Sequence, residues 1–119
     1  MGRFKSNVGR MHEDYLKPQE NGSHWGCHYV KLVSNCGLGL LITGDETFSF
    51  NASCYTQEEL TNKSHNFELE KCGNTVLCID YAQSGIGSNS CGPELMEKYC
   101  FNAQRFHYTM FIKPFTKIP

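Results

Sequence analysis

Residues 18–22 read Pro-Gln-Glu-Asn-Gly, and two further blocks of the same character follow along the chain. The second block, 50–60, reads Phe-Asn-Ala-Ser-Cys-Tyr-Thr-Gln-Glu-Glu-Leu, and the third, 79–87, reads Ile-Asp-Tyr-Ala-Gln-Ser-Gly-Ile-Gly. Each block contains a turn or a helix cap and is flanked by residues typical of β-strands. In the first block, the pair Asn21-Gly22 favours positive φ and therefore a tight turn. The blocks thus divide the chain into short strands joined by turns.

The sequence around these blocks predicts five strands. We expect them at residues 27–34, 38–43, 46–52, 75–82 and 105–113. Turns are expected between strands at residues 35–37, 43–45 and 72–74. The last strand alternates, which places Phe106, Tyr108, Met110 and Ile112 on one face. Short strands separated by turns at intervals of about 8–12 residues indicate an all-β fold, here an antiparallel β-sandwich.

One short helix is expected near residues 57–63. Thr56 precedes it and Glu59 follows three residues later, so the two should form a capping box in which each side chain bonds the other's backbone N–H. The acidic residues of the first turn suit the positive end of the helix dipole. The polar residues 62–64 should end the helix.

The composition is that of one globular domain spanning residues 1–119. Apolar residues make up 39% of the chain, and the net charge of −1 gives neither a basic patch for nucleic acid nor an acidic tail. The N-terminus lacks the apolar stretch of a signal peptide, and the longest apolar run, 38–42, is too short to cross a bilayer. We therefore expect a cytoplasmic protein that contacts neither nucleic acid nor a membrane.

The chain contains seven cysteines. An odd count without a signal peptide favours thiols in a reducing compartment over a disulfide framework, which leaves a secreted disulfide module as an alternative. The sequence contains no C-x-x-C pair, so the usual spacing of a zinc site is absent. We expect no metal or cofactor in this chain.

Paired carboxylates are the first candidates for chemistry, because glycoside hydrolysis needs two that flank one bond. Neighbouring acids at 13–14 and 45–46 would point to opposite faces of a strand. The pair at 58–59 is explained by the start of the helix. Glu68 and Glu70 would share a strand face, but nothing else marks them. We therefore assign no catalytic residue.

Other side chains offer weaker signals. Cys91 lies in a loop, residues 89–93, where a functional thiol could sit, but the sequence pairs it with no general base. Trp25, Tyr29 and Tyr55 could each stack on a sugar ring. Such aromatic residues are more often half-buried in a sandwich.

The three blocks together resemble the family 2 β-galactosidases, and the resemblance runs over residues 2–113. Residues 15–22 match the family's Y-x-x-P-Q-E-N-G. Residues 50–65 match its F-x-x-x-x-Y-S/T-Q-x-x-L with a following Ser-His. Residues 80–93 match its D-x-x-Q/H-x-G-I/V/L-G and S-W/C-x-P. Three such motifs in order are far more specific than any one alone.

This resemblance implies a galactose-mutarotase-like β-sandwich of the supersandwich type, which is the family's C-terminal or fifth domain. It also implies that the catalytic carboxylates lie on a separate barrel domain absent here, and that the family's magnesium and sodium ions lie on other domains. In some relatives a tryptophan of the S-W-x-P loop stacks on substrate, and Cys91 takes that place here. We therefore expect substrate contacts from Asn89, Ser90 and Cys91.

The function that the resemblance implies is a structural and active-site-rim domain of a β-galactosidase that hydrolyses terminal β-galactosides such as lactose. The isolated chain should be inactive, and its partner should be the remainder of the β-galactosidase chain. The family domain has a long segment before the part that matches Gly2, so this chain should lack strands of the sandwich. Missing strands expose sheet edges and apolar faces, and we expect a homo-oligomer that buries them. The alternative is a stand-alone carbohydrate-binding β-sandwich.

Overall fold

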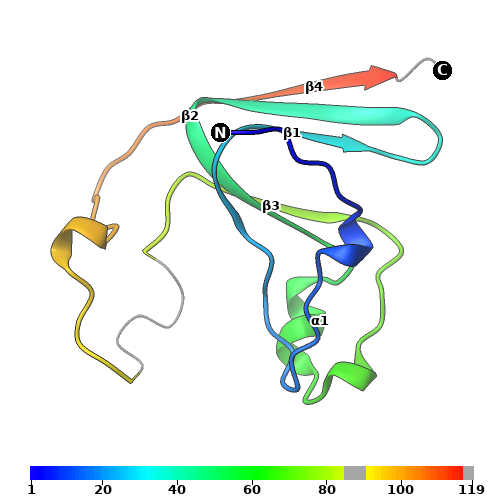
Figure 1. The fold of residues 1–119 in the computed structure, drawn as a ribbon, viewed down its shortest axis with the longest axis horizontal. Helices are drawn as coiled ribbons and strands as arrows, with labels where there is room; N and C mark the ends of the chain where they lie inside the picture. The colour runs from blue at the N-terminus through cyan, green and yellow to red at the C-terminus, as the bar shows by residue number, and fades with distance from the viewer. Residues whose placement is uncertain (85–90, 117–119) are drawn as a thin grey trace. The chain divides into compact units, whose positions relative to one another are not determined.

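The computed structural model describes residues 1–84 and 91–116 of the chain. Its elements, in chain order, are η1 (Val8–Arg10), β1 (His24–Val33), β2 (Leu38–Ser53), α1 (Gln57–Asn62), η2 (Asn66–Glu68), β3 (Val76–Asp80), η3 (Glu97–Tyr99) and β4 (Met110–Thr116) (Figure 1). Within these ranges four strands form one sheet in the order β1-β2-β3, and β4 also pairs with β2. A mostly β protein with an antiparallel sheet and one short helix is therefore confirmed. The second layer of a sandwich stays a prediction.

The chain forms two compact units. Unit 1 consists of residues 1–25 and 50–79, and unit 2 consists of residues 26–49 and 80–119. The prediction that residues 1–119 form a single domain stays a prediction.

Each unit has a small apolar core. In unit 1 the buried residues are Pro18, Ala52 of β2 and Leu60 of α1. In unit 2 the buried apolar side chains are Val30, Ile42 and Phe48. Small cores of this kind bury few large side chains, so hydrogen-bonded turns must contribute a large share of the local order.

The β1–β2 hairpin follows the prediction closely. Gly37 N–H donates to the Ser34 carbonyl at 3.1 Å, and Ser34 N–H donates to the Leu38 carbonyl at 2.8 Å. Gly37 has φ +85°, the left-handed conformation that glycine adopts without cost. The predicted turn at 35–37 is thereby confirmed, and β1 begins at His24, three residues before the predicted start.

The predicted turn at residues 43–45 is wrong, because β2 is one strand of 16 residues that passes through Gly44. Gly44 pairs with Met110 of β4, and Asp45 N–H donates to the Thr109 carbonyl at 3.1 Å. A Cβ at Gly44 would lie 2.6 Å from the Glu46 carbonyl oxygen, so the backbone folds too tightly for any side chain there. Glycine marks a local bend of a continuous strand here, as it often does in sheets.

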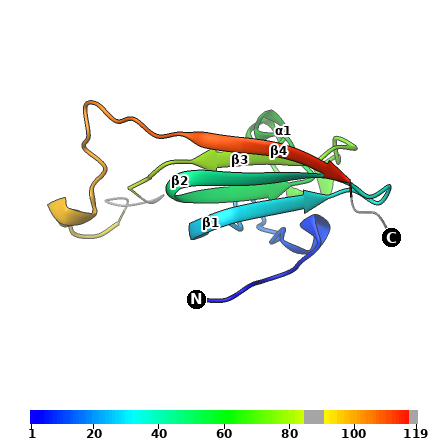
Figure 2. The same ribbon diagram turned by 90° about the horizontal axis from the view of Figure 1, so that it is seen from above.

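β4 is displaced from its predicted position. The alternation predicted a strand at 105–113, but β4 spans Met110–Thr116 and runs through Pro114. Its register pairs Leu38 with Thr116 and Ile42 with Ile112. β4 pairs with β2 alone in the described sheet and is therefore an edge strand, the position at which a sheet tolerates proline (Figure 2).

The helix agrees with its prediction in position and in part of its cap. α1 spans Gln57–Asn62, and the Thr56 hydroxyl accepts the backbone N–H of Glu59 at 3.1 Å. The other half of the predicted capping box is wrong, because the Glu59 carboxylate accepts the backbone N–H of Glu70 at 2.8 Å instead. Glu59 therefore ties the helix to the segment before β3.

No helix among the described residues has the length and apolar character needed to cross a membrane.

Candidate functional site

The residues predicted to contact substrate belong to one short stretch. Asn89 and Ser90 lie outside the described residues. Cys91 is described, and its side chain is exposed. The flanking segments 80–84 and 91–108 therefore define the surroundings of the predicted site.

Four aromatic side chains from these flanking segments form a cluster in unit 2. Tyr81 follows β3 directly, and its ring stacks on those of Tyr108 and Phe106 with centroid distances of 5.0 and 5.6 Å. The Phe101 ring meets Tyr81 edge-on at 6.3 Å. These separations fall within the range of favourable aromatic pairs. We call Tyr81, Phe101, Phe106 and Tyr108 the aromatic cluster.

The aromatic cluster lies where the two flanking segments are joined. The Ser84 hydroxyl accepts the backbone N–H of Phe101 at 2.7 Å. Ser84 immediately precedes the undescribed stretch, and Phe101 follows Cys91 by ten residues in the sequence. The hydrogen bond and the ring contacts thus hold together the two segments that frame the predicted substrate loop.

Carboxylates border the aromatic cluster. The Tyr81 hydroxyl donates to Glu46 Oε2 at 3.3 Å. The negative charge of Glu46 raises the pKa of Tyr81, and partial desolvation and the hydrogen bond add to the effect. Asp45 Oδ1 accepts the backbone N–H groups of Glu46 and Thr109 at 3.0 and 3.1 Å. The carboxylates therefore orient neighbouring groups.

Chemically, this region suits binding better than bond cleavage. Phe106 is 56% exposed and presents an apolar ring to solvent, while Tyr81 and Glu46 offer a hydroxyl and a carboxylate beside it. An apolar ring beside hydrogen-bonding groups can receive the apolar face of a sugar and its hydroxyls. The sequence signal for part of the cluster was the alternation that put Phe106 and Tyr108 on one face. No pattern in the sequence indicated that Tyr81 and Phe101 would join these two residues.

The other aromatic candidates lie elsewhere. Trp25 is 87% exposed and Tyr29 is 44% exposed in β1. Tyr55 packs its ring against His12 at a centroid distance of 4.8 Å. None of the three belongs to the aromatic cluster.

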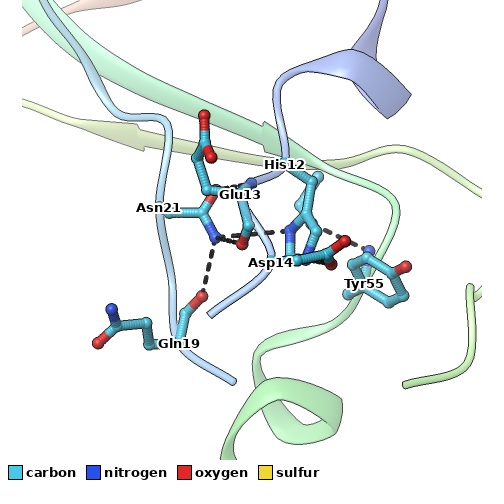
Figure 3. A network of polar contacts seen from close by, with 7 residues as sticks. His12, Glu13, Asp14, Gln19, Asn21 and Tyr55 are labelled. Carbon is cyan, nitrogen blue, oxygen red and sulfur yellow. Dashed lines mark hydrogen bonds and ion pairs between the residues drawn. The ribbon is translucent and has the colours of Figure 1, made fainter. Parts of the chain in front are cut away.

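The Pro-Gln-Glu-Asn-Gly block builds a second polar arrangement, in unit 1 (Figure 3). Asn21 Oδ1 accepts the Glu13 backbone N–H at 3.0 Å, and Asn21 Nδ2 donates to the Glu13 and Gln19 carbonyls at 3.2 and 3.1 Å. The Asn21 carbonyl accepts the side-chain amide of Asn51 in β2 at 2.6 Å. We call Asn21 with these partners the Asn21 network. It joins the N-terminal segment to β2.

The backbone beside this network requires glycine at position 22. Gly22 has φ +75°, and a Cβ at this position would lie 2.9 Å from the Met11 carbonyl oxygen. The predicted positive φ is confirmed, but the predicted tight turn is wrong, because residues 18–23 form neither a turn nor a bend. Both the conformation and the close approach of Met11 exclude a larger residue without strain.

A small hollow lies beside the Asn21 network, bordered by Met11, Glu20 and Leu60 among others. Its volume of about 20 Å³ is enough for a water molecule and far too small for a sugar. His12 Nε2 is buried next to it and has no hydrogen-bond partner among the described residues. Asp14 Oδ1 lies 3.4 Å from this nitrogen, an ion-pair distance without the geometry of a hydrogen bond. The region is therefore a structural element of unit 1.

Two of the candidate acidic residues, Glu59 and Glu68, bond backbone groups. Glu68 Oε2 accepts the backbone N–H groups of His65 and Ser64 at 2.8 and 3.0 Å. The hydrogen bond from His65 is the main cause that lowers the pKa of Glu68. A carboxylate that caps η2 in this way serves the backbone, as the Glu59 carboxylate does at Glu70.

All seven cysteines lie in the described ranges, and they are thiols. Cys36 occupies the β1–β2 turn, where a hydrogen bond with the Ser34 hydroxyl is the main cause that lowers its pKa. Burial raises the pKa of Cys27. Over residues 1–84 and 91–116, histidine, cysteine and acidic side chains form no group suited to hold a metal ion.

Comparisons with known proteins identify a family and several relatives that match most of the chain. The family described as "Beta galactosidase small chain" matches residues 1–112. A beta-galactosidase of Actinobacillus pleuropneumoniae is 52% identical over 99 residues, which is 83% of this chain and 9% of that protein. A beta-galactosidase of Staphylococcus xylosus is 43% identical over 110 residues, 92% of this chain and 11% of that protein. A beta-galactosidase of Kluyveromyces lactis is 30% identical over 94 residues, which is 79% of this chain and 9% of that protein.

The predicted resemblance is confirmed by these matches. The chain spans about a tenth of the length of the curated relatives it matches.

Proposed function

Because the chain belongs to the beta galactosidase small chain family, we propose that it is the C-terminal structural and active-site-rim domain of a β-galactosidase. The reaction of the whole enzyme is the hydrolysis of terminal β-galactosides such as lactose, with retention of configuration. The observation that carries this proposal is the family match over residues 1–112. The partner is the remainder of a β-galactosidase chain, in a cytoplasmic homo-oligomer whose magnesium and sodium ions lie on other domains.

In this proposal the antiparallel sheet is one layer of a galactose-mutarotase-like β-sandwich. A sheet with an apolar side is stable when that side is buried against a second layer. The exposed apolar side chains of unit 2, among them Leu38 at 58% and Ile112 at 61% exposure, support such a missing layer.

The rim lies at the loop that contains Asn89, Ser90 and Cys91. Its support is the aromatic cluster, since Tyr81 and Phe101 join the segments on either side of this loop. Cys91 is exposed at the described end of the loop and so is accessible to a substrate. A thiol in place of a stacking tryptophan gives a smaller contact, so this loop orients substrate weakly.

Catalysis belongs to another part of the enzyme. The Glu59 carboxylate accepts the backbone N–H of Glu70, and the Glu68 carboxylate accepts that of His65, so both acids have structural roles in this chain. Retaining glycosidases need two carboxyl groups about 5–5.5 Å apart on opposite sides of the scissile bond. We therefore expect no turnover of a galactoside by the isolated chain.

The experiment is a segment exchange in a whole enzyme. The chain replaces the matching segment of the Actinobacillus pleuropneumoniae beta-galactosidase, and hydrolysis of nitrophenyl β-galactoside and lactose is measured. We expect the chimera to keep activity, a deletion of the same segment to lose it, and the isolated chain to show none. Turnover by the isolated chain, or a dead chimera beside an active parent, would refute the proposal.

The rim assignment has its own test in the same chimera. Cys91→Ala should raise KM for lactose at least about twofold with little change in folding, because a substrate contact is lost. Cys72→Ala is the matched control, since Cys72 is also an exposed thiol but belongs to unit 1. Equal KM values for both variants would remove Cys91 from the rim.

A stand-alone carbohydrate-binding module is the second candidate, and the aromatic cluster is the observation that favours it. Such a module binds sugar without the rest of an enzyme. Calorimetric titration of the isolated chain with galactose and lactose distinguishes the two. Saturable heat that disappears in Phe106→Ala would support the module, whereas the rim proposal predicts no saturable heat.

A further inference from the structure

Two of the seven thiols belong to residues whose backbones are bonded to each other in unit 1. The Cys72 backbone N–H donates to the Cys54 carbonyl oxygen at 3.0 Å. Cys54 follows the end of β2 and Cys72 precedes β3, so α1 and η2 lie between them in the sequence. We call Cys54 and Cys72 the thiol pair. The fold thus brings together two cysteines that the sequence separates by a helix.

Further contacts hold the thiol pair in place. The Glu59 carboxylate accepts the Glu70 backbone N–H at 2.8 Å, which ties the segment before Cys72 to α1. The Thr56 hydroxyl accepts the backbone N–H of Glu59 at 3.1 Å, which fixes the start of α1 just after Cys54. The approach of the two cysteines therefore depends on more than one hydrogen bond.

The backbone separation suits a disulfide. A backbone N–H···O bond of 3.0 Å between neighbouring segments sets the two Cα atoms about 5–6 Å apart. Disulfides join cysteines whose Cα atoms are about 4.4–6.8 Å apart. Cys72 Sγ now donates to the Asn74 carbonyl at 3.3 Å, a weak S–H hydrogen bond that rotation of the side chain breaks easily. The two sulfurs can therefore meet without a large movement of the backbone.

The two thiols differ in access. Cys72 is exposed, and it lies in the run 70–75, in which every residue is exposed. Cys54 is half-buried. A small molecule in solution therefore reaches Cys72 first, and Cys54 is placed to act second. Neither thiol belongs to the predicted substrate loop, so the pair is separate from the proposed rim.

We infer that the thiol pair is a modification site for low-molecular-weight disulfides such as glutathione disulfide, which convert it into a Cys54–Cys72 disulfide. The Cys72 thiolate attacks one sulfur of glutathione disulfide, whose S–S bond breaks and releases one glutathione thiolate. The Cys54 thiolate then attacks the Cys72 sulfur of the mixed disulfide, which releases the second glutathione thiolate. The protein loses two electrons and two protons, and glutathione disulfide gains them as two glutathione thiols.

The bridge closes α1 and η2 into a covalent loop. A cross-link removes conformational freedom from the unfolded chain, so it stabilises the fold when it fits the native backbone. Excess thiol reverses the exchange and opens the loop again. The modification thus couples the stability of unit 1 to the balance of thiol and disulfide in solution.

The first experiment treats the reduced chain with glutathione disulfide at neutral pH. Digestion without reductant and mass spectrometry should show a peptide that joins Cys54 to Cys72 and disappears with dithiothreitol. Cys54→Ala should instead keep glutathione on Cys72, because the second thiol is missing. Cys36, exposed in the β1–β2 turn of unit 2, is the internal control and should keep its glutathione.

The second experiment asks whether the bridge fits the folded chain. The melting temperature of the bridged chain should exceed that of Cys72→Ala treated in the same way by about 5 °C. Cys72→Ala changes an exposed position and carries the same adducts elsewhere, so it isolates the bridge. At a fixed glutathione ratio, the equilibrium constant for bridge formation should be at least about tenfold larger in buffer than in urea that unfolds the chain.

Three outcomes would overturn the inference. Glutathione on both Cys54 and Cys72 without a bridge would show that the sulfurs do not meet. A bridge from either cysteine to a third one would show that the pairing is different. Equal equilibrium constants in buffer and urea, with no rise in melting temperature, would show that the bridge forms only when unit 1 is open.

Discussion

In unit 1 the side chain of Asn21 bonds three backbone groups, two of Glu13 and one of Gln19, and its carbonyl accepts the side-chain amide of Asn51. In unit 2 the sheet buries Ile42 and Phe48 but leaves Leu38 and Ile112 in water. Around Asn21 the order of unit 1 therefore rests on hydrogen bonds, whereas in the sheet of unit 2 it rests on a few buried apolar side chains. The difference teaches which kind of contact a substitution removes in each unit.

The largest loss of stability is expected from truncating Ile42 in unit 2. Ile42→Ala should lower the free energy of unfolding by about 3 kcal/mol, because a buried side chain is truncated within β2. Urea titration of the isolated chain measures it. Leu38→Ala, on the same face of the same strand but exposed, should cost less than about 1 kcal/mol. Similar losses for the two variants would mean that Leu38 is packed as closely as Ile42.

In unit 1 the corresponding change is Asn21→Ala. It should cost about 2 kcal/mol, because the Glu13 and Gln19 backbone groups lose their partner. Asn62→Ala is the control, since Asn62 is exposed at the end of α1. If both alanine variants unfold at the same urea concentration, the Asn21 network does not order unit 1.

The helix cap gives a smaller effect in unit 1. Thr56→Ala should lower the free energy of unfolding by about 1 kcal/mol, because the Glu59 N–H loses its acceptor. Thr61→Ala changes the same residue type inside α1, where alanine is the better helix former. Thermal melts followed at 222 nm should therefore order the proteins as Thr56→Ala below wild type and Thr61→Ala near it.

Glu68 adds a pH dependence to unit 1. Its folded pKa is lowered below the ordinary value of 4.5 by backbone hydrogen bonds, chiefly that of His65. A lowered folded pKa stabilises the protein above the unfolded value, and this contribution is lost as pH falls through the folded pKa. The stability difference between wild type and Glu68→Gln should therefore shrink from neutral pH to below 4.5. A difference that stays constant over this range would contradict the cap.

The smallest effect concerns the β1–β2 turn in unit 2. The Ser34 hydroxyl lowers the pKa of Cys36, which raises the thiolate fraction at neutral pH. Ser34→Ala should slow alkylation of Cys36 by iodoacetamide about twofold. The rate at Cys91, read in the same samples by mass spectrometry, is the internal control. Unchanged labelling of Cys36 would show that the turn does not tune this thiol.

Local signals predicted much of this protein. The positive φ of Gly22, the turn around Gly37 and the Thr56 cap were predicted correctly, because each depends on side chains within a few residues. The motifs likewise predicted the family, which the comparisons confirm. The turn predicted at residues 43–45 was wrong, since pairing of Gly44 with Met110 keeps β2 continuous.

The candidate site was less accessible to such reasoning. The sequence placed Cys91 in a loop but did not give the exposure of its side chain, and the shared face of Phe106 and Tyr108 followed from alternation. The contact of these rings with Tyr81 joins segments 25 or more residues apart, and nothing in the local pattern reports it.

The sequence by itself therefore determined the turn at Gly37, the Thr56 cap, the strand-rich character and the family, because these depend on neighbouring residues and on motifs in order. Only the tertiary structure decided where β2 and β4 pair, which side chains share a face of the sheet, and how the aromatic cluster forms. The physical reason is that register and face depend on hydrogen bonds and packing between distant segments. A shift of one residue would exchange the faces of Ile112 and Phe111.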